Sequence, residues 1–366
     1  MATLLHVPDL AAPASPSWSS DRDETLRCVQ VRQETHDVKT FVLAAEGPRS
    51  FRYLPGQFIT LELEIDGSKI NRCYTLSSTP TRPDLVSITV KRVPGGPVSN
   101  WLHDHFRAGM SLGAIGPAGV FSCFSHAPAQ RYLFLSGGSG VTPLMSMTRA
   151  LHDLGSDADI VFVHCARTPA DLLFPEELTL MARNMAHLRL AYVCDQPLPG
   201  SAYAGHLGRM DAARLAHIAP DFLLRDVYTC GPALFMAGVR GLLAASGYDM
   251  QRYREESFLF EALDVPPPPA ADAGAAGASD VHHIELQKTG QSFTCRSDQT
   301  ILQAATAAGL RLPSSCSSGV CGTCKTRKVS GQVQMNHAGG IRAREVDQGW
   351  ILPCCSKPTS NVALER

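Results

Sequence analysis

Short runs of alternating apolar and polar residues fill the chain between residues 25 and 125. Alternation with a period of two puts every second side chain on one face, which is the pattern of a half-buried β-strand. Gly and Pro separate the runs, so turns rather than helices connect them. The pattern predicts an antiparallel β-barrel. Its predicted strands are Thr25–Gln33, Lys39–Leu43, Phe58–Glu64 and Leu85–Val93.

Between residues 131 and 250, continuous apolar runs alternate with helical stretches. This succession predicts βαβ units and a doubly wound α/β domain with a parallel sheet. The predicted strands are Tyr132–Leu135, Ile160–His164, Leu188–Cys194 and Val227–Cys230, and the predicted helices are Pro143–Leu154, Glu176–Asn184 and Ala233–Ser246.

A stretch rich in Pro, Ala and Gly, Val265–Ser279, interrupts the chain. Such a composition cannot build a core and is typical of a linker. The chain is therefore expected to be a multidomain protein. Its expected parts are a mobile extension at 1–24, a barrel at 25–127, an α/β domain at 128–264, a linker at 265–280 and a small α+β domain at 281–366.

The composition narrows the class of protein. With 366 residues, 44% of them hydrophobic, the chain is long enough for two or three cores. A net charge of −1 argues against a nucleic-acid partner. No apolar run has the length of a membrane span, and the first 20 residues do not form a signal peptide. We therefore expect a cytoplasmic protein with no membrane partner, in which twelve cysteines indicate metal or redox use.

The most specific signal is a set of cysteines in the C-terminal part. Cys316, Cys321 and Cys324 have C-x4-C-x2-C spacing, and Cys354 follows 30 positions later. This is the plant-type spacing for a [2Fe–2S] cluster, which needs four thiolates. Small residues between them let backbone N–H groups turn toward the sulfurs. A zinc site would pair C-x2-C with a second such pair or with His, and a disulfide would suit a secreted chain.

A second candidate site lies in the predicted barrel, at Arg72-Cys73-Tyr74-Thr75. Alternation on one strand lets Arg72 and Tyr74 offer a cation and an aromatic face to one flavin. Downstream, Ser99 is predicted to cap a helix through about Phe106, whose N-terminus suits a phosphate. Taken singly, these segments are also typical of a surface Arg, a core Tyr and an ordinary capped helix. The candidate flavin residues are Arg72, Cys73, Tyr74, Thr75, Thr89, Lys91, Gly96, Val98 and Ser99.

Two glycine turns follow apolar strands in the α/β domain. Each leads from a strand into a helix, where backbone N–H groups meet a pyrophosphate, and both are expected to face one crevice. The alternative for Cys230 is a buried thiol at a strand end. The candidate nucleotide residues from these turns are Gly137, Gly138, Thr142, Pro143, Cys230, Gly231, Pro232 and Met236.

In this order, the motifs resemble the ferredoxin–NAD(P)⁺ reductase family with a C-terminal ferredoxin domain of the β-grasp type. The resemblance implies that the barrel binds FAD and the α/β domain binds NAD(P)H. It also implies a nucleotide contact at Arg167, a flavin cover at Phe258, and Cys354 rather than Cys355 as the fourth cluster ligand. Segments 27–41, 90–104 and 253–258 further resemble reductases of bacterial glycine betaine and related quaternary-amine monooxygenases, whose partner is a Rieske-type oxygenase.

The expected protein converts a two-electron donor, NADH, into a source of single electrons. NADH gives two electrons as a hydride, the flavin releases them singly, and the cluster passes them to the oxygenase. No acid–base catalyst is required, and none is assigned. FMN and NADPH remain the alternative cofactors. The alternative functions are a reductase that works alone or with another redox protein, and a non-enzymatic iron–sulfur carrier.

The C-terminal domain is also basic. Residues 281–366 carry ten Lys and Arg residues against five Asp and Glu residues. Lys325, Arg327 and Lys328 directly follow the third cysteine. This basic face is expected to meet an acidic surface of the oxygenase, and the alternatives are a solvated surface or a contact with the chain's own acidic flavin domains.

Overall fold

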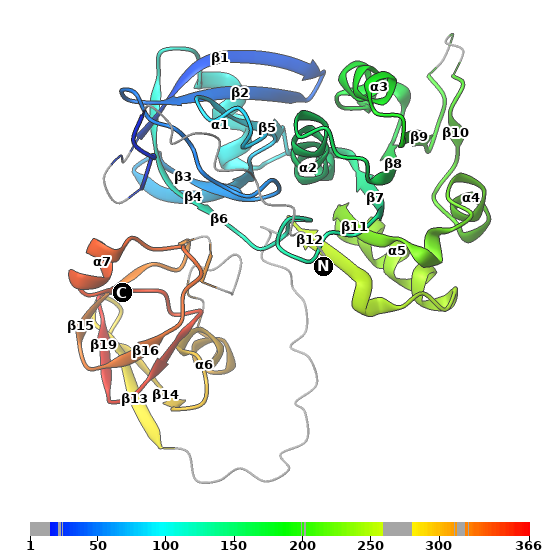
Figure 1. Ribbon diagram of the computed structural model, residues 1–366. Helices are drawn as coiled ribbons and strands as arrows, with labels where there is room; N and C mark the ends of the chain where they lie inside the picture. Colours follow the sequence, from blue (N-terminus) through cyan, green and yellow to red (C-terminus); the bar gives the residue numbers. More distant parts are fainter. Residues whose placement is uncertain are drawn as a thin grey trace.

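The computed structural model describes residues 15–20, 23, 25–198, 200, 203–258, 280–310, 312, 319–320 and 322–366. Most of the expected N-terminal extension, most of the expected linker, and two predicted cluster ligands, Cys316 and Cys321, lie outside the described residues. The described residues form three domains that follow one another along the chain (Figure 1).

The first domain is a six-stranded antiparallel sheet in the order β4-β3-β6-β1-β2-β5. An isolated antiparallel bridge between Leu76 and Ile88 brings the end of β4 to β5, which curls the sheet into a barrel. Leu61 and Phe41 are fully buried in its interior. The strands are β1 Thr25–Thr35, β2 Val38–Ala45, β3 Phe58–Ile65, β4 Ser68–Thr75, β5 Val86–Lys91 and β6 Ser111–Ala118.

Helix α1 spans Pro97–His105 and packs against this barrel. The predicted cap at Ser99 is wrong, because the N-cap is Gly96, three residues earlier, and the helix begins at Pro97. Pro97 suits the first helical position, since its ring fixes φ and the missing N–H would have no partner there. Ser99 instead accepts a hydrogen bond from the Val93 N–H at 3.1 Å and thereby holds the turn that precedes the helix.

The second domain is a six-stranded parallel sheet in the order β10-β9-β8-β7-β11-β12. Alternate residues of its central strands face opposite sides. Phe134 packs with α2 and α3, whereas Leu135 packs with α4 and α5, so helices cover both faces (Figure 1). Its elements are β7 Arg131–Gly137, α2 Val141–Asp153, β8 Asp159–Ala166, α3 Pro175–Asn184, β9 Leu188–Cys194, β10 His206–Leu207, α4 Ala212–Ile218, β11 Asp226–Gly231, α5 Ala233–Ala245, β12 Tyr253–Ser257, and the 3-10 turns η1 Gly138–Gly140, η2 Pro169–Asp171, η3 Phe222–Leu224 and η4 Met250–Arg252.

The third domain is a mixed sheet in the order β14-β13-β19-β15-β17 with a helix packed on it. β13 runs parallel to β19 and antiparallel to β14. A second, two-stranded sheet pairs β16 with β18. The elements are β13 Val281–Leu286, β14 Gln291–Arg296, α6 Ile301–Ala307, β15 Thr326–Ser330, β16 Val333–Met335, α7 Ala343–Asp347, β17 Trp350–Ile351, β18 Ser356–Pro358 and β19 Val362–Leu364.

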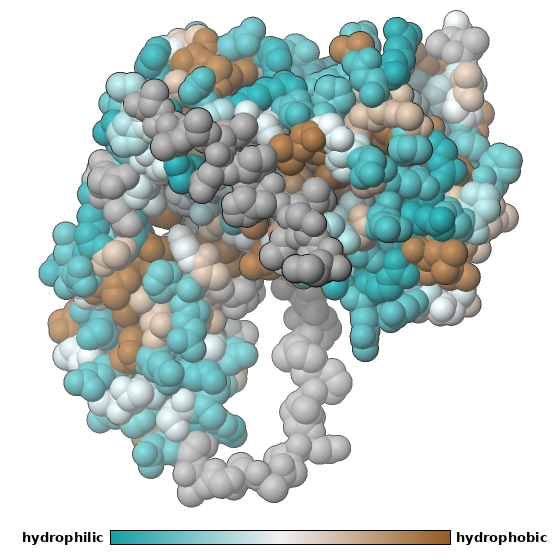
Figure 2. Space-filling view, viewed as in Figure 1, coloured by the Kyte–Doolittle hydropathy of each residue, from teal (hydrophilic) through white to brown (hydrophobic). Residues whose placement is uncertain are grey.

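The predicted fold class, an antiparallel barrel, a doubly wound α/β domain and an α+β domain, is confirmed. On the face in Figure 2, apolar residues form small groups among polar ones. Within the described residues, none of the helices combines the length and the apolar character that crossing a membrane requires.

Candidate flavin, nucleotide and cluster sites

The candidate flavin motif occupies the end of β4. Arg72 and Tyr74 share one side of the strand and alternate with Cys73 and Thr75, which are almost fully buried. Burial raises the pKa of the Tyr74 phenol, although the charge of Arg72 opposes the shift, so the ring stays neutral. The Oγ1 of Thr75 is buried without a hydrogen-bond partner among the described residues. A bound ligand that accepts or donates a hydrogen bond at Thr75 would remove this cost.

Two predicted flavin residues have other partners. The Thr89 hydroxyl lies 2.8 Å from Oγ1 of Thr40 and 2.9 Å from Oγ of Ser77, so its hydrogen bonds are made inside the barrel. Lys91 forms an ion pair with Asp37 at 3.4 Å and lines a pocket toward the second domain. Of the two predicted residues at the start of α1, Val98 is buried in the barrel core and Gly96 precedes the helix.

The two glycine turns of the second domain pack directly on each other. A Cβ added at Gly140 would lie 2.3 Å from the Cys230 carbonyl oxygen, and one added at Gly231 would lie 2.7 Å from the Phe235 ring. Gly138 has a φ of +52°, a conformation that side chains rarely adopt. Glycine therefore lets the start of α2 and the start of α5 approach one crevice, as the sequence predicts for a pyrophosphate site.

A pocket opens where these turns face the barrel. Among the predicted residues, it is lined by Lys91, Gly137, Gly138, Arg167 and Pro232. The other predicted nucleotide residues support its walls, because Thr142 and Pro143 are buried at the start of α2 and Met236 is buried in α5. Sequence reasoning missed the other lining residues, which include the three carboxylates of Asp37, Asp171 and Asp195 and the ring of Phe235.

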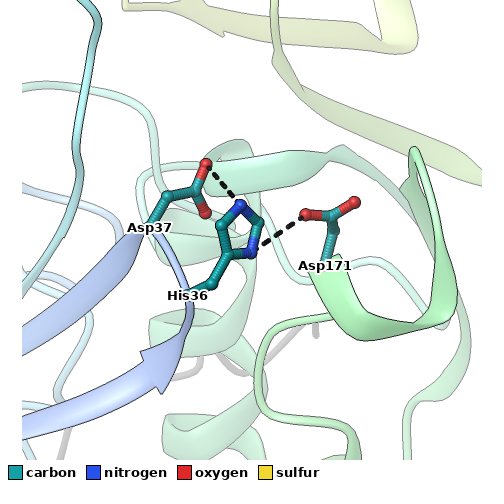
Figure 3. A group of neighbouring side chains, drawn as sticks. All are labelled: His36, Asp37 and Asp171. Atoms are coloured by element: carbon teal, nitrogen blue, oxygen red, sulfur yellow. Dashed lines mark ion pairs between the residues drawn. The ribbon is translucent and has the colours of Figure 1, made fainter.

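A cluster of charged side chains beside this pocket connects the barrel with the nucleotide domain. Arg167 donates to Asp171 at 2.9 Å and lies 3.5 Å from Asp37. The His36 ring stands between the same carboxylates, with a ring nitrogen 3.8 Å from each (Figure 3). His36 and Asp37 come from the β1–β2 turn and Asp171 from η2. The barrel and the nucleotide domain therefore share one border of the pocket.

Glu256 is the most perturbed carboxyl group near these sites, and sequence reasoning did not single it out. The residue is partly exposed, but its Oε2 is buried and has no hydrogen-bond partner among the described residues. Burial, with a smaller contribution from Cys73, raises the pKa of Glu256 to about 8. Burial and the charge of Glu256 in turn hold the pKa of Cys230 well above its ordinary value. The carboxyl thus lies between the flavin strand β4 and the nucleotide turn after β11.

Phe258 follows β12 and packs, partly buried, against the core group that contains Cys230 and Tyr228. This position lies next to Glu256 at the same edge of the sheet. Two buried oxygens without a hydrogen-bond partner among the described residues, a neutral Tyr and a glycine-lined crevice therefore surround the junction of the first two domains. These residues fit a flavin in the barrel with a dinucleotide beside it.

Two of the four predicted cluster ligands are described. Cys324 and Cys354 are buried, and their sulfur atoms lie 3.3 Å apart, too far for a disulfide of about 2.05 Å. The Gly319 N–H donates to the Cys354 Sγ at 3.2 Å. Cys355 turns its Sγ toward the Leu352 carbonyl oxygen at 3.5 Å instead. The Cys324 and Cys354 sulfur atoms and the Gly319 N–H group fit a cluster with Cys354 among its ligands.

Family models match all three domains. The 2Fe-2S iron-sulfur cluster binding domain matches residues 284–359. The oxidoreductase FAD-binding domain matches residues 25–123, and the oxidoreductase NAD-binding domain matches residues 134–241. These matches confirm FAD, NADH and a [2Fe–2S] cluster as the cofactors, and they make the chain an NAD(P)H-dependent flavin and iron–sulfur oxidoreductase. The alternative of a non-enzymatic carrier is therefore excluded.

Whole-chain relatives share this domain order. The glycine betaine monooxygenase reductase subunit of Pseudomonas aeruginosa strain UCBPP-PA14 is 44% identical over 95% of this chain and 96% of its own length. The chain belongs to the family of oxygenase reductase subunits. A second member, the stachydrine N-demethylase reductase subunit of Rhizobium meliloti strain 1021, is 43% identical over 95% of this reductase and 97% of its own length.

The reductase also has the fold of a solved structure with the same three parts. Phthalate dioxygenase reductase superposes with a TM-score of 0.57 and 22% identity, and the match covers 95% of this chain and all of that one. Phthalate dioxygenase reductase is described as a modular structure for electron transfer from pyridine nucleotides to a [2Fe-2S] centre. The shared fold places a ferredoxin module after the two reductase modules in both proteins.

Proposed function

We propose that this reductase takes a hydride from NADH onto FAD and passes single electrons through its [2Fe–2S] cluster to a Rieske-type oxygenase. The substrate we propose for that oxygenase is glycine betaine or a related quaternary amine, which loses a methyl group. The observation that carries the amine assignment is the identity of 43–44% with the glycine betaine monooxygenase and stachydrine N-demethylase reductase subunits, along 95% of the chain.

The direction of electron flow supports a Rieske-type partner. A plant-type cluster has a potential of about −400 mV, whereas Rieske centres lie at about −150 to +300 mV. Electrons therefore move downhill from this chain to such a partner. The proposed setting is the cytoplasm, where cysteines are kept reduced.

Bound FAD supplies the chemistry that accepts a hydride and releases its electrons one at a time. The chain positions it and excludes water. Tyr74 offers a neutral aromatic ring, and the start of α1 offers backbone N–H groups. Glu256, with a pKa of about 8, holds a proton on its carboxyl group at pH 7 beside Cys230. The glycine turns bring the nucleotide to the same junction.

The charges around the pocket favour NADH over NADPH. Lys91 and Arg167 both line the pocket, and each is already paired with a carboxylate. An additional phosphate would face Asp37, Asp171 and Asp195 without an unpaired cation among the described lining residues. The repulsion of like charges then weakens NADPH binding.

The test is reconstitution with a purified glycine betaine oxygenase. Each methyl group removed should consume one O2 and one NADH and release one formaldehyde and one water. We expect formaldehyde only when reductase, oxygenase and glycine betaine are all present, and a higher rate with NADH than with NADPH. Rapid oxidation of NADH with ferricyanide, but no reoxidation of the reduced cluster by the oxygenase, would contradict the proposed partner.

A further inference from the structure

The third domain contacts the barrel through a buried arginine. The Arg342 side chain, just before α7, is only 5% exposed. Its guanidinium donates two hydrogen bonds to the Glu62 carboxylate of β3, from Nη2 to Oε2 at 2.6 Å and from Nη1 to Oε1 at 3.3 Å. It also donates to the carbonyl oxygens of Ser20 and Ala114. In Figure 1, the end of the third domain that carries α7 faces the barrel.

A second cation reaches the same carboxylate. Lys325 Nζ lies 3.5 Å from Glu62 Oε1 and 2.6 Å from Glu345 Oε1. Burial alone would raise the pKa of Glu62, but hydrogen bonds and charges from Arg342 and Lys325 outweigh it and hold the pKa below its ordinary value. The expectation that Lys325 meets the oxygenase is wrong in this structure, because Lys325 faces the chain's own flavin domain, which was the alternative.

This polar contact is linked to both redox sites. Glu62 is paired across the sheet with Asn71, the residue before Arg72 of the flavin motif. On the other side, Lys325 follows Cys324, and Ile341, next to Arg342, packs in the same apolar group as Cys324 and Cys354. A Cβ added at Gly322, in the cluster loop, would lie 3.3 Å from the Asn71 side-chain nitrogen.

We propose that Glu62, Arg342 and Lys325 form a docking latch that holds the cluster loop against the flavin strand and so sets the rate of flavin-to-cluster electron transfer. A buried ion pair adds little net affinity, because the loss of hydration offsets the attraction, but an unpaired partner is costly. The latch therefore selects one docking orientation rather than tightening the contact. Electron transfer slows steeply with distance, so a wrong orientation costs rate.

The inference rests on the flavin-to-cluster order in the proposed function. Each hydride brings two electrons, and each oxidised cluster accepts one, so the docked arrangement serves two successive transfers per NADH. Glu62, Arg342 and Lys325 take no part in the redox steps themselves. They are positioning residues that act through the separation of the two centres.

The test is Glu62→Gln, which removes the charge and leaves the cluster domain unaltered. Anaerobic stopped-flow mixing with NADH separates hydride transfer to the flavin from transfer to the cluster. We expect the first rate to stay unchanged and the second to fall by about tenfold or more. The flavin content and the cluster spectrum should remain those of the unmodified protein. The control is Asp298→Asn, which also removes one carboxylate charge, but from an exposed ion pair with Arg296 in the cluster domain. It should change neither rate.

Arg342→Gln tests the latch from the other domain, so a folding defect in one variant leaves the other decisive. Slowed flavin-to-cluster transfer with both centres intact, in either variant, supports the latch. If both variants transfer electrons to the cluster as fast as the unmodified protein, which itself reduces its cluster through the flavin, the docking latch is refuted and the proposed function is not. If the unmodified protein fails to reduce its cluster after its flavin, the proposed function itself fails.

Discussion

Replacing Gly140 by Ala tests the packing of the two nucleotide turns. The new Cβ would lie 2.3 Å from the Cys230 carbonyl oxygen and 2.5 Å from the Gly231 nitrogen. Because ordinary contacts begin at 3.4 Å, the turn after β11 must move by about 1 Å. Both obstructing atoms belong to the backbone, so no side chain can rotate away.

Overpacking of this kind costs about 1–3 kcal/mol. If this free energy is lost from NADH binding, the KM for NADH rises about 5- to 150-fold. The assay is NADH-dependent ferricyanide reduction, which uses the flavin and the nucleotide but not the cluster. The melting temperature and flavin content are measured on the same samples.

The matched controls are Gly238→Ala and Gly241→Ala, two changes of the same kind in α5. A Cβ at either position meets nothing within 4 Å. Alanine should stabilise the helix there by about 0.5–1 kcal/mol and leave the KM for NADH unchanged. An unchanged KM and melting temperature for Gly140→Ala would refute the close approach of the turns.

Two further predictions concern Glu256 and the cluster. Between about pH 4.5 and 8 the folded protein holds a proton on Glu256 that the unfolded chain has released, so the free energy of unfolding falls as the pH rises. In denaturant unfolding, the stability of Glu256→Gln relative to the unmodified protein should therefore increase by about 2–3 kcal/mol between pH 5.5 and pH 7.5. Parallel curves of stability against pH for the two proteins would contradict the raised pKa. Cys354→Ser should lose the [2Fe–2S] spectrum while Cys355→Ser keeps it, and the reverse result in electron paramagnetic resonance would assign the fourth ligand to Cys355.

Much of the fold follows from local pattern. The apolar runs of β7, β8, β9 and β11 predict their strands to within two residues, because strands buried on both faces carry little else. β6 and β12 were not predicted. β6 contains two glycines and a proline, and β12 is Tyr-Arg-Glu-Glu-Ser, so neither shows an apolar or alternating run. Both strands are specified by the neighbours with which they pair.

The site residues also fall into those that a local sequence motif predicts and those that are specified by contacts with distant segments. Motifs with fixed spacing, such as the cysteine loop and each glycine turn, are visible in the sequence, because one short segment supplies most of the local geometry. The groups near Glu256 and Glu62 come from distant segments, as does the His36 ring beside Asp171, and Glu62 lies 280 positions from Arg342. Such contacts arise only when the domains pack. Lys325 is the clearest case, since its charge alone does not reveal which acidic surface it meets.

Whether electrons leave this protein through the cluster is tested by removing the cluster while keeping the flavin. Cys324→Ser replaces a buried ligand of the predicted set, and Cys355→Ser serves as the control with an intact cluster. Both proteins are assayed with NADH for ferricyanide reduction and, with the oxygenase, for formaldehyde release. We expect Cys324→Ser to reduce ferricyanide at the ordinary rate but to support no demethylation above background. Undiminished formaldehyde release by the protein without its cluster would show that electrons leave from the flavin and not from the cluster.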